Sequence, residues 1–182
     1  MSNTSTLEVR VIDNLGRDKT PILDKEIEDL QNFMNRVLRE SNKGTYSDRT
    51  IESIPYELRQ DRMMHTFAVI VYTNEQAGDR KIVGSGFLND WKPGGYEGGR
   101  WEVRCMYIDH VCQRIGLGSR ILKELEEKAK RIGMETLDLE AVNLPGTVQF
   151  YKKNGWVTTN EYEKEIEEER VRLTHMSKSL KG

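Results

Sequence analysis

Two glycines, Gly116 and Gly118, stand where the chain changes from one periodicity to another. Residues 101–108 before them alternate between apolar and polar types, as a strand does, and the residues after them carry apolar side chains at helical spacing. Because glycine lacks a Cβ atom, such a turn can leave backbone N–H groups uncovered at the positive end of a helix dipole. The turn is therefore a candidate binding site for an anion, most often a phosphate.

Two common phosphate-binding motifs do not fit this turn. A P-loop requires a glycine, four residues and then Gly-Lys-Ser or Gly-Lys-Thr, and the chain contains no such run. A dinucleotide-binding fingerprint requires a third small residue at position 121, which is isoleucine here, and a longer series of βαβ units. The pattern that remains is Gln-x-x-Gly-x-Gly, formed by Gln113, Gly116 and Gly118.

The elements around the turn predict one mixed α/β (α+β) domain. Strands are expected at 8–13, 66–72, 81–88, 101–108, 134–142, 156–159 and 171–178, and helices at 22–41, 45–62 (weak, interrupted by Pro55), from the turn to Gly133, and at 147–153. Residues 1–7 are expected to be loosely ordered and 89–100 to form a loop. Since antiparallel hairpins surround a single βαβ crossover, we expect a mixed, mostly antiparallel sheet flanked by helices.

Composition narrows the function classes. The 182 residues suffice for one domain, and a net charge of −2 does not indicate a nucleic-acid surface. No apolar run reaches membrane-spanning length and no signal-peptide core is present, so a cytoplasmic protein without a membrane partner is expected. Cys105 and Cys112 are expected to be free thiols. His65, His110 and His175 lack metal-ligand spacing and are interpreted as surface or capping groups, so no metal is expected.

The turn and the blocks after it resemble the GNAT family, the Gcn5-related N-acetyltransferases. In that family's order, the strand, the glycine turn and an amphipathic helix are followed here by Asn143, by Phe150-Tyr151 and by Gly155-Trp156. The resemblance covers residues 81–178. It implies a GNAT-like central sheet with a splayed pair of parallel strands around a coenzyme A site, with residues 81–178 as the coenzyme-binding core and 8–62 on the acceptor side.

The resemblance also implies the coenzyme-binding residues. Acetyl-CoA would be the cosubstrate, with its pyrophosphate on the N–H groups of the turn and its pantetheine arm paired with the strand before it. Asn143 would hydrogen-bond the same arm. The residues so implied are Met106, Tyr107, Ile108, Gln113, Arg114, Ile115, Gly116, Leu117, Gly118, Ser119, Asn143 and Tyr151.

Acetyl transfer to an amine requires a neutral nucleophile, a polarised thioester carbonyl and a proton for the leaving thiolate. The resemblance places Tyr151 near the coenzyme sulfur, where a phenol, with an ordinary pKa of about 10, can protonate a thiolate. Glu102 is the expected base, because some protein-acetylating members carry a catalytic glutamate eleven residues before the position of Gln113. Glu140 on the next strand and a water molecule are the alternatives.

The expected function is transfer of an acetyl group from acetyl-CoA to a primary amine, by direct attack in a ternary complex. The alternatives are a non-catalytic coenzyme-A-binding sensor of the same fold and a transferase of a longer acyl group. The acceptor, a small-molecule or protein amine, would approach over residues 22–62 and the loops near 91–96 and 162–169. The sequence leaves its identity open. Homodimers are frequent in the family, so a homodimer is an expectation here as well.

Overall fold

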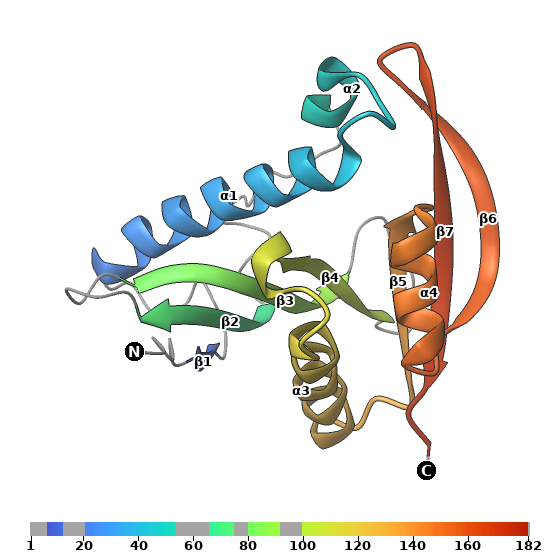
Figure 1. Cartoon of the computed structure of the whole chain (residues 1–182). Coiled ribbons are helices and arrows are strands. Elements are labelled where there is room, and N and C mark those ends of the chain that lie inside the picture. Colours follow the sequence, from blue (N-terminus) through green and yellow to red (C-terminus); the bar gives the residue numbers. More distant parts are fainter. Residues whose placement is uncertain (1–6, 13–20, 54–65, 75–79, 92–99, 182) are drawn as a thin grey trace.

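The computed structural model describes residues 7–12, 21–53, 66–74, 80–91 and 100–181 (Figure 1). The strands are β1 (Leu7–Ile12), β2 (Thr66–Asn74), β3 (Arg80–Trp91), β4 (Arg100–Ile108), β5 (Thr136–Val142), β6 (Val157–Ile166) and β7 (Glu169–Ser179). The helices are α1 (Pro21–Asn42), α2 (Asp48–Ser53), α3 (Leu117–Arg131) and α4 (Pro145–Lys153), with a 3-10 turn at His110–Cys112.

The seven strands form one sheet in the order β1-β2-β3-β4-β5-β7-β6. Every neighbouring pair is antiparallel except β4 and β5, which are parallel and joined through α3. The sheet is therefore mixed and mostly antiparallel, which confirms the fold class expected from the sequence.

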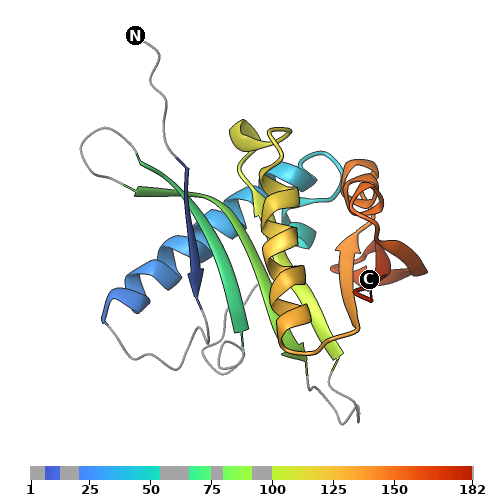
Figure 2. The same cartoon turned by 90° about the horizontal axis from the view of Figure 1, so that it is seen from below.

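Helices cover both faces of the sheet (Figure 2). On one face, Leu30, Phe33 and Met34 of α1 pack against Ile70 and Phe87 of the sheet. On the other face α3 and α4 share a second, larger core with the central strands, and α3 buries its residues at the expected helical spacing: Leu117, Ile121, Leu122, Leu125 and Ala129. Each fully buried Leu or Ile stabilises the fold by roughly 1.5–3 kcal/mol.

The glycine-aromatic pair after α4 fixes that helix against α3. Gly155 has φ 82°, so it ends the helix in a conformation that suits glycine. Trp156 is buried, and its indole Nε1 donates to Glu126 Oε1 of α3 at 3.1 Å. Lys178 of β7 donates to the other oxygen of Glu126 at 2.7 Å. The buried indole N–H and the carboxylate are thus both satisfied.

The element boundaries differ from the sequence expectation in a few places. β1 begins at Leu7, one residue earlier than expected. β3 extends through Trp91 and β4 begins at Arg100, so strands occupy both ends of the expected loop from Asn89 to Arg100. The reason is ladder pairing, because Asn89 lies opposite Glu102 and the hairpin continues to Trp91 opposite Arg100. The second helix is limited to α2 in the described chain. His65, Pro55 and Tyr96 lie outside the described residues.

A β-bulge in β4 overturns one expectation about its faces. Tyr107 lies opposite Ser85 but Arg104 lies opposite Phe87, so β4 contains one extra residue, and Cys105 adopts φ 51°. The buried Ser85 hydroxyl donates to Cys105 O at 2.9 Å and holds the bulge. Strict alternation along the strand would place Trp101, Val103, Cys105 and Tyr107 on one face. Instead Cys105 and Tyr107 pack on the α1 side, whereas Trp101, Val103, Met106 and Ile108 pack on the α3 side.

Gly86→Ala is expected to lower the free energy of unfolding by about 1–3 kcal/mol, because it overpacks the core opposite the bulge. A Cβ at Gly86 would lie 2.6 Å from Met106 Sδ and from Ile121 Cγ2. Urea unfolding measures the loss. Gly146→Ala is the matched control, because a Cβ there meets nothing within 4 Å. Equal stability of the two variants would contradict the packing argument.

Candidate functional site

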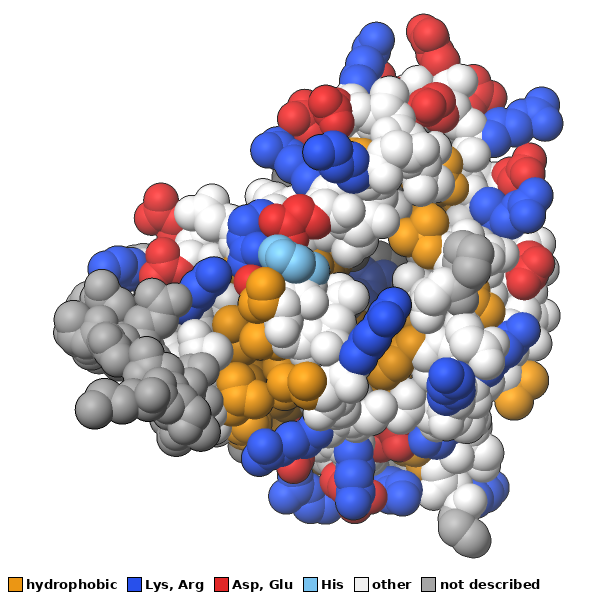
Figure 3. Space-filling view, in the orientation of Figure 1, with side chains coloured by type: hydrophobic (Ala, Val, Ile, Leu, Met, Phe, Trp, Pro, Cys, Tyr) orange, Lys and Arg blue, Asp and Glu red, His pale blue; other side chains and the backbone are white. Residues whose placement is uncertain are grey.

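A cleft of about 1610 Å³ opens where β4 and β5 separate. Only two residue pairs join these strands, Glu102 with Asp138 and Val103 with Leu139. Beyond them β4 continues along β3 while β5 follows β7. The space-filling view shows the hollow between the part of the molecule that carries α4, β6 and β7 and the rest (Figure 3).

Backbone groups of β4 face this gap. Asp109 N–H donates to Val83 O of β3 at 2.9 Å, so the N–H groups of Asp109 and Tyr107 point toward β3. Because alternate residues of a strand direct their hydrogen-bonding groups to opposite edges, those of Met106 and Ile108 point toward β5. Gln113 Nε2 donates to Ile108 O at 3.3 Å. The edge of β4 can therefore pair with an extended ligand, as the sequence resemblance implies.

The turn between β4 and α3 forms a concave row of backbone N–H groups. Arg114 has φ 63° and Gly116 has φ 84°. Positive φ at alternate residues directs successive N–H groups to one side and makes an anion-binding concavity. Within the described chain no backbone carbonyl accepts from the N–H groups of residues 114–119, whereas Arg120 N–H donates to Gly116 O at 3.0 Å. The row therefore fits a phosphate group.

Most of the predicted site residues line this one cleft. They are Glu102, Met106, Tyr107, Ile108, Gln113, Arg114, Gly116, Leu117, Gly118, Ser119 and Tyr151, together with the alternative base Glu140. Two others do not line it. Ile115 is 63% exposed at the tip of the turn. Asn143 N–H donates to Arg172 O of β7 at 2.8 Å, and its neighbours Val142 and Leu144 line the cleft instead.

Tyr151 is held by the aromatic residues around it. Its ring lies edge-on to Phe150, with centroids 5.0 Å apart, and to Trp156, with centroids 6.0 Å apart. The side chain is buried in the core and reaches the cleft from α4. Because Phe150 also packs against Gly118, the position of Tyr151 is tied to the start of α3.

Glu102 lies on the wall of the cleft with one fixed partner. Arg104 Nε donates to Glu102 Oε2 at 2.7 Å. Burial raises the pKa of Glu102 above its usual value, and the neighbouring Arg104 offsets only part of that rise. A partly desolvated carboxylate with a raised pKa is better matched to proton transfer near neutral pH than an exposed one.

Glu140, the alternative base, is engaged differently. It accepts a hydrogen bond from the Tyr162 hydroxyl of β6. Burial, together with this hydrogen bond and the nearby charge of Glu140, raises the pKa of Tyr162 to about 12. Tyr162 therefore remains a hydrogen-bond donor to Glu140 at neutral pH.

Sequence reasoning did not place several charged or titratable residues in the cleft, among them Arg104, Asp138, Lys164 and His175. His175 was interpreted as a surface or capping group, but it lines the cleft from β7 opposite Glu140. Asp138 and Glu140 alternate with the buried Leu137 and Leu139, and this pattern indicated that both side chains lie on the sheet face opposite those leucines. No sequence pattern indicated that His175 lines the cleft, because the pairing of β7 with β5 and β6 determines where its side chain lies.

The tip of the β6–β7 hairpin contacts the α1–α2 region at one end of the molecule (Figure 1). Ser47 donates from its hydroxyl to Glu169 Oε2 at 2.6 Å, and Ser53 donates to Glu167 at 3.1 Å. Arg49 forms an ion pair with Glu167 at 2.6 Å. Acidic residues at the tip of the hairpin therefore hold α2 and the segment that precedes it.

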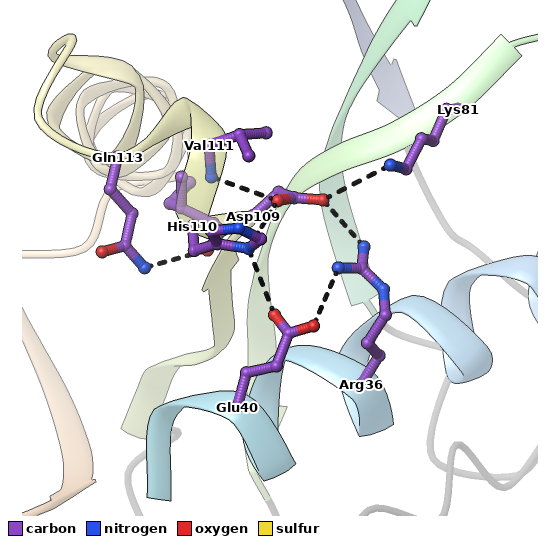
Figure 4. A network of polar contacts seen from close by, with 8 residues as sticks. Arg36, Glu40, Lys81, Asp109, His110, Val111 and Gln113 are labelled. Carbon is purple, nitrogen blue, oxygen red and sulfur yellow. Dashed lines mark hydrogen bonds and ion pairs between the residues drawn. The ribbon is translucent and has the colours of Figure 1, made fainter. Parts of the chain in front are cut away.

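A polar network ties α1 to the residue that precedes the turn (Figure 4). Asp109 is 1% exposed, and one oxygen accepts from Arg36 at 2.8 Å while the other accepts from Val111 N–H at 3.2 Å. Burial raises the pKa of Asp109, but the hydrogen bonds from Arg36 and Val111 outweigh it and the pKa lies below its ordinary value of 3.8. The ionised carboxylate thus anchors both segments.

Asp109→Asn is expected to lower the free energy of unfolding by about 1.5–3 kcal/mol at pH 7, because it weakens hydrogen bonds to a charged partner. The folded pKa is depressed, so wild type has the full contribution above 3.8 and loses it as the pH falls through the lower folded value. Urea unfolding at pH 7 and pH 3 should show a smaller difference at pH 3. Glu40→Gln, at an exposed member of the network, should cost less than about 1 kcal/mol. An equal loss in both variants would contradict the role of Asp109.

The described residues also bear on the expectations about membrane spans, metal ligands and cysteines. None of their helices is long and apolar enough to span a membrane. No group of three or more His, Cys, Asp or Glu side chains among them is arranged to hold a metal ion. Cys105 and Cys112 are free thiols, as expected, and burial raises the pKa of Cys105 to about 12.

Known structures share this fold at low sequence identity. YncA of Salmonella typhimurium, with its cofactor acetyl-CoA, superposes with a TM-score of 0.65 at 16% identity, covering 98% of this chain and 96% of that one. PaiA N-acetyltransferase of Thermoplasma acidophilum, with coenzyme A, gives 0.62 at 16% identity and covers 96% and 99%. An N-acetyltransferase of Staphylococcus aureus Mu50 gives 0.62 at 14% identity and covers 97% and 99%.

No curated protein matches the chain. The sequence profile of the acetyltransferase (GNAT) domain matches residues 42–180. That span includes the glycine turn, the strands β4 and β5 that separate at the cleft, and all the candidate catalytic residues. The chain therefore belongs to the GNAT family of acetyltransferases.

Proposed function

We propose that this protein transfers an acetyl group from acetyl-CoA to a primary amine by direct attack of the amine in a ternary complex. The observation that carries the proposal is one cleft lined by the N–H row of residues 114–119, by the partly buried carboxylate of Glu102 and by the buried phenol of Tyr151. Binding of acetyl-CoA or CoA by the similar structures YncA and PaiA supports acetyl-CoA as the cosubstrate.

The residues of the cleft fit coenzyme A. The N–H row of residues 114–119 would bind its pyrophosphate, and the edge of β4 that faces β5 at Met106 and Ile108 would pair with the pantetheine arm. The coenzyme would supply the thioester. The chain would supply Tyr151 to protonate the leaving sulfur and Glu102 to take a proton from the attacking nitrogen. Glu140 and a water molecule remain the alternatives to Glu102.

The acceptor is proposed to be a small-molecule or protein amine. The cleft is also lined by Glu102, Asp138 and Glu140, which suit a cationic amine, and by the cations Arg104 and Lys164. The free thiols Cys105 and Cys112 suit a reducing compartment, and we propose the cytoplasm as the location.

A free-thiol release assay with acetyl-CoA tests the proposal. The amine panel would contain 1,4-diaminobutane, spermidine, 2-phenylethylamine, an α-amino acid, and a peptide with a free N-terminus and one lysine. Amine-dependent thiol release with at least one of them is expected. Tight CoA binding without turnover would replace the proposal with a non-catalytic sensor. Faster turnover with propionyl-CoA or succinyl-CoA would replace it with a longer-chain acyltransferase.

A further inference from the structure

Proton counting shows that the proposed reaction needs two proton acceptors. A primary ammonium carries three protons on nitrogen and the amide product keeps one, so two protons must leave. One ends on the coenzyme sulfur, and Glu102 and Tyr151 account for it. The other must leave the ammonium before attack, because a protonated nitrogen has no lone pair, and it ends in solvent. Its acceptor must therefore reach both the cleft and the solvent.

His175 lies where such an acceptor is needed. It lines the cleft from β7, beside Glu140 on β5 and close enough to Glu102 for their charges to interact. On its other side lies β6, the edge strand of the sheet, where Thr159 is exposed to solvent. The imidazole is the side chain whose charge ordinarily changes between about pH 5 and pH 8.

A β-bulge in β6 brings Thr159 to the histidine ring. Thr158 lies opposite Met176 and Asn160 lies opposite His175, so Thr159 is an extra residue in β6. Bulges redirect side chains and are common beside active sites. Here the Thr159 hydroxyl lies 2.8 Å from His175 Nδ1 and 3.1 Å from His175 O.

These two contacts select one tautomer of His175. The main-chain oxygen can only accept, so the single hydroxyl proton of Thr159 goes to His175 O. The hydroxyl oxygen then accepts from Nδ1–H. Nε2 is left with its lone pair and has no hydrogen-bond partner among the described residues. Protonation of Nε2 leaves the bond to Thr159 intact, so the same contact holds both charge states.

We propose, on the basis of the proposed function, that His175 is a catalytic base which removes the first proton of the acceptor ammonium, with Thr159 presenting its Nε2. The ammonium N–H bond breaks, an Nε2–H bond forms, and the nitrogen keeps the electron pair with which it attacks the thioester. Glu102 then takes the second proton as the C–N bond forms, and that proton replaces the one that Tyr151 gives to the sulfur. The imidazolium releases its proton to solvent at the exposed edge of the sheet.

Other charged and titratable groups face the same part of the cleft. They are Glu102 and Arg104 on β4, Asp138 and Glu140 on β5, and Tyr162 and Lys164 on β6. The test therefore compares variants over a pH range. An amine with an ordinary pKa near 10.4 is largely ammonium at pH 7 and substantially neutral at pH 10. Only a base that acts on the ammonium becomes dispensable at pH 10.

The experiment measures kcat/KM for acetyl-CoA and the panel amine that turns over fastest, from pH 7 to pH 10. His175→Gln should lower kcat/KM by about 100-fold at pH 7, within the range for a general base, and by less than about tenfold at pH 10. Glu102→Gln should show a loss that persists at pH 10. Thr159→Val should lose about tenfold at pH 7, and Thr159→Ser should restore the activity, because serine keeps the hydroxyl.

Thr158→Val is the matched control. Thr158 is the neighbour of Thr159 and lies opposite Met176, and its buried hydroxyl oxygen has no hydrogen-bond partner among the described residues. It should keep wild-type activity at both pH values. A His175→Gln loss that is equal at pH 7 and pH 10, or no loss at pH 7, would overturn the proposal and leave the proposed function standing. Absence of amine-dependent turnover in wild type would remove the proposed function itself.

Discussion

Replacing Tyr151 with phenylalanine is expected to lower kcat by about 100-fold and to change the Kd of CoA by less than about threefold, as for loss of a general acid. The ring is buried between Phe150 and Trp156, so phenylalanine can occupy the same space. Only the hydroxyl is removed. Without it the coenzyme thiolate leaves without its proton donor, whereas the groups that bind pyrophosphate and pantetheine are unchanged.

Thiol release gives kcat for this variant, and isothermal titration gives the Kd of CoA. Tyr72→Phe is the control, because the Tyr72 hydroxyl is also buried but lies on β2 outside the cleft. That variant should keep wild-type kcat. An unchanged kcat in Tyr151→Phe would exclude Tyr151 as the acid.

Gly118→Leu is expected to weaken CoA binding by about 100-fold or more, which corresponds to a loss of about 3 kcal/mol or two charge-assisted hydrogen bonds. A Cβ at Gly118 would already lie 3.2 Å from the Phe150 ring and 3.6 Å from Ile108 Cγ1. A branched side chain must therefore displace the ring or point into the N–H row. Either outcome removes hydrogen bonds that the pyrophosphate would accept.

A graded series tests this steric argument by isothermal titration and thermal shift. Gly118→Ala requires the ring to move by only a few tenths of an ångström and should lie between wild type and Gly118→Leu. Gly116→Ala meets no atom within 4 Å but must adopt φ 84°, which costs roughly 1–2 kcal/mol. If acetyl-CoA raises the melting temperature of Gly118→Leu as much as that of wild type, the cradle is not at this turn.

Local sequence signals predicted the glycine turn and the main elements well. The change of period at Gly116 and Gly118 marks the start of α3, because glycine frees the backbone there and the apolar spacing beyond defines a helix. The order of antiparallel hairpins and one crossover also predicted the mixed sheet. These features depend on residues close together in the chain, so one amino-acid sequence is enough to predict them.

The faces of β4 and the location of His175 could not be predicted in the same way. The bulge at Cys105 reverses the alternation along β4, and its cause is the pairing with β3 and the hydroxyl of Ser85, twenty residues away in sequence. The bulge at Thr159 likewise depends on the register between β6 and β7. The main-chain N–H of Asn143 likewise pairs with Arg172 O of β7, and its contact with the pantetheine arm stays a prediction. Long-range register therefore determines which side chains meet in the cleft.

The weak pairing of β4 with β5, through two residue pairs, has a thermodynamic consequence. The sheet consists of two halves that backbone bonds barely join, so the coenzyme proposed to pair along β4 would serve as a missing strand. A ligand that binds only the folded chain stabilises it by RT ln(1 + [L]/Kd), which is about 2.7 kcal/mol at a hundredfold excess over Kd. The folding equilibrium of this protein would then follow the acetyl-CoA concentration of the cell, and its abundance would report on acetyl-CoA supply.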